Sequence, residues 1–144
     1  MEPSQEVLKL LPHRNPFLFV DKILAWDETG LTAQRAIRAD EDFFKGHYPH
    51  QPIMPGVLLC ECLFQTGALF LSKVLDLDDS EPMTPVVTRI NNVRFRAPVL
   101  PGDTLVLKTS LTERLNDVFF MKGMIQRDHK RIVSLDFACT LLKA

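Results

Sequence analysis

The sequence predicts an α+β domain in which an antiparallel sheet of about six strands wraps around one long hydrophobic helix. Its apolar centre predicts the helix, because residues 51–72 contain one formally charged side chain, Glu61. Four strand-like runs after this segment and two before it predict the sheet. The chain has 144 residues and is 46% hydrophobic, so we expect residues 1–144 to form a single domain with a substantial core.

The part of the chain before the central helix is expected to form a short helix and a pair of strands. Ser4 can cap the first turn of the short helix, and Pro12 can end it. Aromatic and branched side chains on both sides of Gly30 predict the pair of strands. The expected bounds are residues 4–11 for the helix, 17–29 and 31–39 for the strands, and 40–44 for an acidic turn after them.

The central helix is expected to run from Pro55 to about residue 74. Pro55 suits the first turn because its missing N–H is not needed there, and the acidic, proline-containing residues 76–85 end the helix. The helix is apolar nearly all round, so it must be covered on most sides. The sheet covers one side, and we expect a second copy of the chain to cover more. The later strands are expected at residues 86–98, 103–115, 118–128 and 131–144.

Composition argues against several classes of protein. The net charge is −1 and the Lys and Arg residues are scattered, so no nucleic-acid-binding surface is indicated. The first residues are poor in apolar side chains, so we expect no signal peptide. The apolar run at residues 56–71 is 16 residues long, shorter than the about 20 that span a bilayer.

Three cysteines, an odd number, give no disulfide framework and indicate reduced thiols in the cytoplasm. Cys60 and Cys62 point apart on a helix, and no second Cys/His pair has zinc-site spacing, so we expect no metal.

Glu61 is the candidate general acid. A carboxylate in a buried helix loses its hydration unless it is paired or protonated. Burial therefore favours the neutral acid, which is the form that donates a proton near neutral pH. Gln65 lies four residues later on the same helix face, where its amide can hydrogen-bond the carboxyl group. The alternative is a structural glutamate that a buried arginine or a backbone N–H satisfies.

His47 is the candidate base, because imidazole is the usual proton acceptor at neutral pH. It lies in the loop "GHYPHQPIMP", in which three prolines restrict the backbone and so hold the side chain in place. The alternative is an ordinary surface histidine. We expect that role for His13, His50 and His129, which lie in turns.

The start of the central helix supplies hydrogen-bond donors. The first N–H groups, those of Gly56 and Val57, have no intrahelical partner and lie at the positive end of the helix dipole. They can hold a carbonyl oxygen on which negative charge develops, although an ordinary Pro-Gly helix start looks the same. A base, an acid and such donors together suit proton abstraction next to a carbonyl, with loss of a leaving group from the next carbon. The apolar surroundings indicate an acyl chain as substrate.

Three blocks, "LLPHRNPFLFVDKI", "FFKGHYPHQPIMPGVLLCECLFQ" and "VRFRAPVLPGD", resemble the FabZ-type 3-hydroxyacyl-[acyl-carrier-protein] dehydratases of bacterial fatty acid synthesis. They keep that family's order and spacing from about Leu11 to the C-terminus. The resemblance implies a hot-dog fold. It places the catalytic histidine of the family on His47 and the catalytic carboxylate on Glu61, fourteen positions later. The related dehydratase-isomerases have Asp at the second position, so Glu61 favours the simple dehydratase.

The resemblance also implies a reaction and partners. The substrate is a 3-hydroxyacyl group on the phosphopantetheine of acyl carrier protein, the product is a trans-2-enoyl thioester, and no metal or redox cofactor is needed. His47 takes the C2 proton, Gly56 N–H stabilises the thioester oxygen, and Glu61, positioned by Gln65, protonates the leaving hydroxyl. The two catalytic residues of one site come from different subunits of a homodimer, and such dimers usually form trimers.

Some positions depart from the family pattern. Asn15 stands where an aromatic residue is common, and His50 where a small residue is expected. Leu63 and Phe64 replace smaller residues near the expected substrate tunnel. These two changes leave the acyl chain length open, and they allow a specialised dehydratase of a polyketide-like or aryl-polyene pathway.

The carrier protein is acidic, so a basic rim is expected to dock it. Arg89, Arg94 and Arg96 are the candidates, and three solvated strand charges are an equal alternative. Two other functions stay open. One is a hot-dog acyl-thioesterase in which Glu61 activates water, and the other is a non-catalytic acyl-binding subunit.

Overall fold

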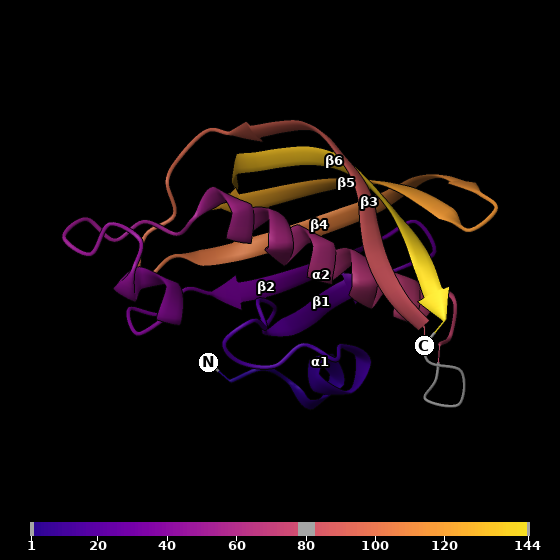
Figure 1. The fold of residues 1–144 in the computed structure, drawn as a ribbon, viewed down its shortest axis with the longest axis horizontal. Coiled ribbons are helices and arrows are strands. Elements are labelled where there is room, and N and C mark those ends of the chain that lie inside the picture. The colour runs from indigo at the N-terminus through magenta and orange to yellow at the C-terminus, as the bar shows by residue number, and fades with distance from the viewer. Residues whose placement is uncertain (1, 78–82, 144) are drawn as a thin grey trace.

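A computed structural model describes residues 2–77 and 83–143, and in them one antiparallel sheet curves around one long helix (Figure 1). The six strands lie in the order β1-β2-β4-β5-β6-β3. This is the predicted hot-dog arrangement, and the central helix and later strands lie close to their expected positions. The helices and strands are α1 (Gln5–Leu10), β1 (Lys22–Trp26), β2 (Gly30–Ala36), the 3-10 helix η1 (Asp42–Lys45), α2 (Gly56–Val74), β3 (Met83–Phe95), β4 (Thr104–Leu115), β5 (Val118–Arg127) and β6 (Lys130–Lys143).

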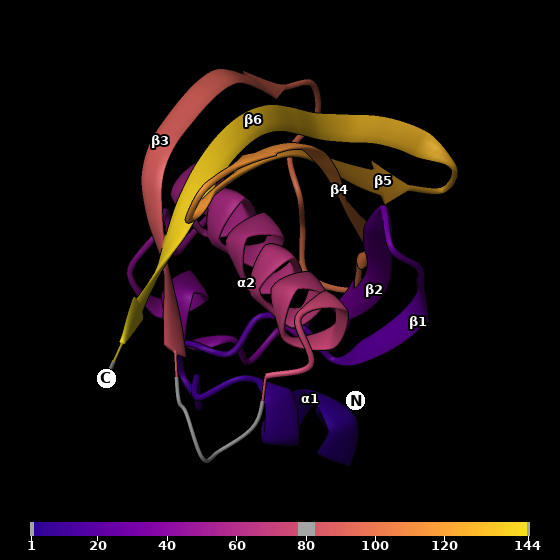
Figure 2. The ribbon, with the colours of Figure 1, turned by 90° about the vertical axis from the view of Figure 1, so that its right-hand side faces the viewer.

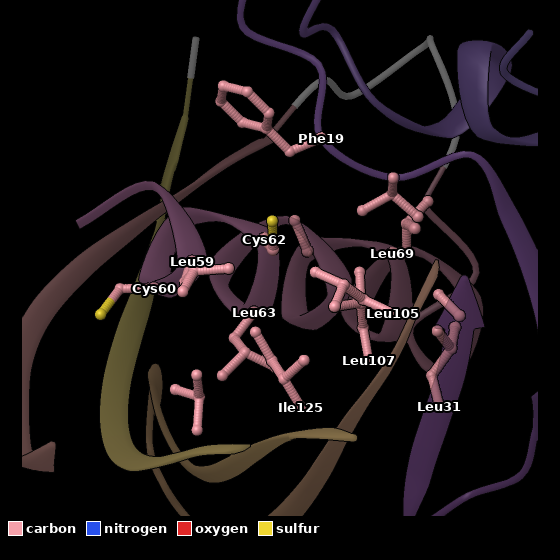
Figure 3. Close-up of a cluster of buried hydrophobic side chains, with 14 of the residues drawn as sticks. Phe19, Leu31, Leu59, Cys60, Cys62, Leu63, Leu69, Leu105, Leu107 and Ile125 are labelled. Atoms are coloured by element: carbon pink, nitrogen blue, oxygen red, sulfur yellow. The ribbon is translucent and has the colours of Figure 1, made fainter. Parts of the chain in front are cut away.

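The core lies between α2 and the inner face of the sheet (Figure 2). Every second residue is buried along β2 and in the first half of β4, as expected for strands with one face on a core. Figure 3 shows side chains of α2 and of the strands gathered in this layer: Leu59, Leu63 and Leu69 from the helix, and Leu31, Leu105, Leu107 and Ile125 from the sheet. By length and composition α2 could also cross a membrane, but a buried core helix passes the same test.

The N-terminal helix forms as its sequence predicts. The Ser4 Oγ accepts a hydrogen bond from the amide of Val7 at 3.2 Å, which satisfies one of the free donors of the first turn. Val7 has no exposed surface and packs into the core. Pro12 follows the last turn, and the Arg14 guanidinium donates to the carbonyl oxygens of Leu8 and Leu11 at 2.8 Å each.

Four expected elements differ in the structure. The strand expected at 31–39 ends at Ala36, and the strand expected at 86–98 runs from Met83 to Phe95. The first strand was expected from residue 17, but β1 begins at Lys22, because the backbone at Phe17 and Phe19 bonds the side chain of Gln65 instead of a neighbouring strand. The acidic turn expected at 40–44 is the 3-10 helix Asp42–Lys45. The helix-ending segment expected at 76–85 has residues 78–82 outside the described residues.

A buried group of three charges ties β2 to the segment before His47. Arg35 Nη1 lies 3.1 Å from Asp21 Oδ1, and Arg35 Nη2 lies 2.6 and 2.7 Å from the two carboxylate oxygens of Glu41. All three residues are buried. The carboxylates also accept backbone amides, Ala36 N on Asp21 at 2.7 Å and Arg38 N on Glu41 at 3.1 Å. This network fixes Glu41, the residue that precedes η1.

β3 forms one edge of the sheet and pairs only with β6 among the described residues. It carries exposed apolar side chains, Ile90 at 46% and Phe95 at 51% exposure. An open edge strand with such side chains is a typical place for another chain to bind. The apolar edge therefore fits the expectation that a second copy covers part of the fold.

Candidate active site

His47 is held in one orientation at the end of η1. Its backbone N–H donates to the Phe43 carbonyl at 3.1 Å, and its ring Nδ1 lies 2.8 Å from the Ile53 carbonyl oxygen. A carbonyl oxygen only accepts, so Nδ1 carries the proton and the lone pair of Nε2 is left free. The next residue, Tyr48, has a φ of 50° and packs its ring 4.5 Å from the imidazole. The local backbone therefore presents Nε2 as a possible proton acceptor.

Glu61 is held by Gln65, as the four-residue spacing predicts. Gln65 Nε2 donates to Glu61 Oε2 at 3.0 Å and to the Phe17 carbonyl at 2.9 Å. Gln65 Oε1 accepts the Phe19 amide at 2.8 Å. Gln65 is 1% exposed, and both of its N–H groups and its oxygen are hydrogen-bonded inside the protein. Glu61 keeps 22% of its side chain exposed, and its Oε1 has no hydrogen-bond partner in the described part of the chain.

Glu61 opens into a cavity of about 480 Å³ between α2 and the β3–β6 side of the sheet. Glu61, Gln65 and His13 form its polar part, and the rest is apolar, with Phe64 from α2 and Phe137 from β6 among the lining residues. The predicted burial of Glu61 in apolar surroundings is thus correct only in part, because this cavity leaves the carboxyl group accessible. A carboxyl group next to an apolar slot is suited to act on a functional group of an apolar ligand.

His13 lies beside Glu61, where the sequence predicted a surface turn. Its Nε2 is 3.9 Å from Glu61 Oε2, and its Nδ1 is buried without a partner among the residues that the structure describes. Burial lowers the pKa of His13, nearby Glu61 raises it and Arg14 lowers it further, with a net lowering from 6.5. His13 is therefore neutral at pH 7. No pattern in the sequence indicates this contact, because it depends on how the turn packs against α2.

The first amides of α2 are free. The amides of Leu58 and Leu59 donate to the Pro55 carbonyl at 3.0 and 3.2 Å, while those of Gly56 and Val57 have no acceptor within the described residues. A Cβ on Gly56 would lie 3.0 Å from the Phe95 ring. The absence of a side chain on Gly56 thus lets this ring pack closely against the helix start. Val57 is 75% exposed, so the free donors face the surface.

The structure brings some of the predicted site residues together and separates others. Glu61, Gln65 and Phe64 line one cavity, which does not include His47. Leu63 does not line this cavity either. Leu63 is fully buried on the sheet side of α2 and packs so closely against Gly123 that a Cβ there would lie 3.0 Å from Leu63 Cδ1. His47 and Glu61 therefore belong to different surfaces of one chain.

The three candidate docking arginines are exposed, Arg89 and Arg94 on β3 and Arg96 directly after it, but they do not share one surface. Arg94 and Arg96 line a hollow of about 770 Å³ on the sheet, together with Lys108. Arg89 lines a separate hollow of about 240 Å³. Among residues 2–77 and 83–143, no group of three or more His, Cys, Asp or Glu side chains could hold a metal ion.

Comparison with known proteins identifies the family. The model of the FabA-like domain matches residues 11–136. The 3-hydroxyacyl-[acyl-carrier-protein] dehydratase FabZ of Aromatoleum aromaticum is 36% identical over 137 residues, which cover 94% of each chain. The FabZ of Petrotoga mobilis is 40% identical over 120 residues, covering 83% of this chain and 84% of the relative.

Solved structures share the fold at low sequence identity. A chain of the dehydratase heterocomplex ApeI:P from Xenorhabdus doucetiae has a TM-score of 0.79 at 14% identity, with 94% of this chain and 90% of that chain covered. The E. coli PaaI protein from the phenylacetic acid degradation operon has a TM-score of 0.65 at 16% identity, with 83% and 81% covered. These structures support the hot-dog fold, and the family follows from the sequence matches. The chain belongs to the FabA-like family, with the FabZ-type dehydratases as its curated relatives.

Proposed function

We propose that this protein is a hydro-lyase that dehydrates 3-hydroxyacyl-[acyl-carrier-protein] to trans-2-enoyl-[acyl-carrier-protein] in fatty acid biosynthesis. The curated relatives bear the name of this dehydratase. The observation that carries the proposal is the chemistry of the two candidate residues: His47 has a free Nε2, and Glu61 is held at the polar end of an apolar cavity. The reaction needs a base and an acid but no metal or redox cofactor.

In the proposed mechanism His47 Nε2 removes a proton from C2 of the substrate. The hydrogen bond from Nδ1–H to the Ile53 carbonyl keeps the lone pair on Nε2 and stabilises the imidazolium that forms. The amide of Gly56 donates to the thioester oxygen as negative charge develops on it, and the helix dipole has the favourable sign there. The amide of Val57 is the second candidate donor.

Glu61 then protonates the leaving hydroxyl group. Because Oε2 accepts the Gln65 amide, Oε1 is the oxygen that carries the transferable proton. The C2–H and C3–O bonds break, the C2–C3 double bond forms, and water leaves. His47 ends the step protonated and Glu61 ends it ionised, so one proton must return from His47 to Glu61, directly or through solvent, before the next turnover.

Each site requires two copies of the chain. His47 and Glu61 of one chain do not share a cavity, so His47 of one subunit is proposed to complete the Glu61 cavity of its partner. Pairing along the exposed edge of β3 would cover Ile90 and Phe95. We propose a homodimer as the minimum and a trimer of dimers as the full assembly.

The proposed carrier-protein surface is the hollow lined by Arg94 and Arg96. These side chains and Lys108 have no acidic partner in the described residues, so they are available to an acidic carrier protein. A cytoplasmic location fits the three free cysteines, which a reducing compartment keeps as thiols.

Hydration of a 2-enoyl thioester, the reverse reaction, tests the function through the loss of enoyl absorbance. His47→Ala and Glu61→Gln should each reduce kcat by at least about 10²-fold, the usual contribution of a general acid or base. His50→Ala is the matched control, because His50 is an exposed histidine in the same loop, and it should keep full activity. Release of free thiol without hydration would instead identify a thioesterase, and carrier binding without either reaction would identify a binding subunit.

Mixing the two inactive variants tests the shared site. If His47 and Glu61 of one site come from different subunits, a mixed dimer of His47→Ala and Glu61→Gln chains contains one intact site. Activity should then recover to a fraction of the wild-type value after subunit exchange. No recovery, when mass spectrometry demonstrates exchange, would mean that each chain holds a complete site.

A further inference from the structure

An aromatic pair narrows the cavity beside Glu61, because Phe64 of α2 and Phe137 of β6 both line it and contact each other. Along one face of α2, Glu61 is followed by the large Phe64 and then by the small Ala68, and all three line the cavity. At 1.5 Å per residue, Phe64 lies about 4.5 Å further along the helix axis than Glu61. A chain that extends from Glu61 along this face therefore meets Phe64 within a few carbon atoms.

Phe64 packs against Phe137 of β6, across the cavity from α2. The ring centroids are 5.2 Å apart and the planes are inclined by 60°, an edge-to-face contact that aromatic pairs favour. Phe137 also packs closely against Gly67 of α2. The contact is so close that a Cβ on Gly67 would lie 2.9 Å from Phe137 Cζ. Phe137 is 3% exposed, so it cannot turn away without opening the core. Phe137 is thus a fixed surface against which the half-buried Phe64 ring packs.

The same cavity continues past Phe64. Ala68 lies one turn past Phe64, and Val86 and Val87 of β3 line the cavity on the opposite side. The path from Glu61 past Ala68 is therefore continuous but narrowed where Phe64 meets Phe137, and removal of the Phe64 ring would widen it. Leu63, the neighbouring bulky residue, faces the sheet and does not border this path.

We propose that Phe64, braced by Phe137, limits the length of the acyl chain, so that the preferred substrates are short-chain 3-hydroxyacyl thioesters. This inference rests on the proposed dehydratase function. It assigns Phe64 the selection of substrate, whereas the proton transfers belong to His47 and Glu61. A short chain ends before the ring, while a longer chain must displace it from a packed contact.

The test is kcat/KM for hydration of a series of 2-enoyl thioesters from butenoyl to dodecenoyl, with wild type and Phe64→Ala. Wild-type kcat/KM should fall beyond the short chains. In Phe64→Ala the fall should move to longer chains, with a gain of about fourfold for each added methylene that becomes buried, which is the equivalent of about 0.8 kcal/mol. Phe64→Leu, which keeps more of the packing, should give a smaller shift in the same direction and guards against misfolding of the alanine variant.

Leu63→Ala is the matched control, because it truncates the adjacent side chain on the sheet side of the helix. It should lower thermal stability and leave the ratio of long-chain to short-chain kcat/KM unchanged. An unchanged ratio in both folded Phe64 variants, or a wild-type preference for dodecenoyl thioester, would overturn the length limit alone. A wild type that hydrates no chain length would remove the proposed function, and with it this inference.

Discussion

Replacing Arg35 by methionine removes the cation from the buried group that it forms with Asp21 and Glu41. In the native protein Arg35 lies 3.1 Å from one carboxylate and 2.6 Å from the other, with 2% of its own side chain exposed. Methionine fills similar space but cannot neutralise either carboxylate. Asp21 is 0% exposed and Glu41 is 8% exposed, so water cannot take over the role of the guanidinium.

The expected loss in the free energy of unfolding is about 3–5 kcal/mol, the range found when one partner of a buried ion pair is removed. The backbone bonds from Ala36 N and Arg38 N persist and keep the loss within this range. For a domain of about 150 residues, where about 1 kcal/mol shifts Tm by about 2–4 °C, Tm should fall by about 6–20 °C.

Urea unfolding followed by far-UV circular dichroism measures this loss. Wild type and variant must be compared at one protein concentration, because association stabilises the folded state by mass action. Lys73→Met is the matched control: it breaks the Lys73–Glu6 pair, in which Glu6 is 47% exposed, and should cost at most about 1 kcal/mol.

A compensated variant tests the reason for the loss. Arg35→Met combined with Asp21→Asn and Glu41→Gln leaves no unpaired charge, so it should be more stable than Arg35→Met alone. The reasoning is refuted if Arg35→Met loses less than the Lys73→Met control. It is equally refuted if the compensated variant recovers nothing, because the carboxylates would then not be the source of the cost.

Three further predictions concern the site and its surroundings. Gln65→Glu keeps an oxygen for the Phe19 amide but loses the donors to Glu61 and to the Phe17 carbonyl, so hydration activity should fall by about tenfold or more and urea unfolding should show a lower stability. The lowered pKa of His13 means that the folded state resists its protonation; unfolding free energy should therefore fall as pH drops below about 6.5, and fall less steeply in His13→Asn in parallel urea titrations. Arg94→Glu with Arg96→Glu should raise KM for a carrier-protein thioester several-fold and leave KM for a pantetheine thioester unchanged, and an equal rise for both would exclude docking at this hollow.

The central helix was predictable because its signal is local. An apolar segment with a proline at its start and acids with prolines at its end specifies a buried helix by composition alone. The start of β1 was not predictable in the same way. Residues 17–21 have the composition of a strand, but the backbone at Phe17 and Phe19 bonds the side chain of Gln65, more than forty positions later. No local sequence pattern indicates a hydrogen bond between residues so far apart in the chain.

In the candidate site, too, local contacts were predictable and long-range contacts were not. The spacing of Glu61 and Gln65 predicts their hydrogen bond, because four residues make one turn of a helix. The position of His13 beside Glu61 depends on how the N-terminal turn packs, and the sequence offered no sign of it. The residue types of His47 and Glu61 indicated a base and an acid, and the family resemblance added that the two come from different subunits. In a single chain His47 does not line the Glu61 cavity.

Gln65 explains why a carboxyl group can be placed in the most apolar segment of the chain. A buried amide is costly unless each of its polar atoms is bonded, and here the bonds run to Phe17, Phe19 and Glu61. Two of these bonds anchor the N-terminal segment to α2, and the third fixes the orientation of the acid. The position of Glu61 therefore depends on the same contacts that stabilise the segment before β1, and a change at Gln65 must affect both.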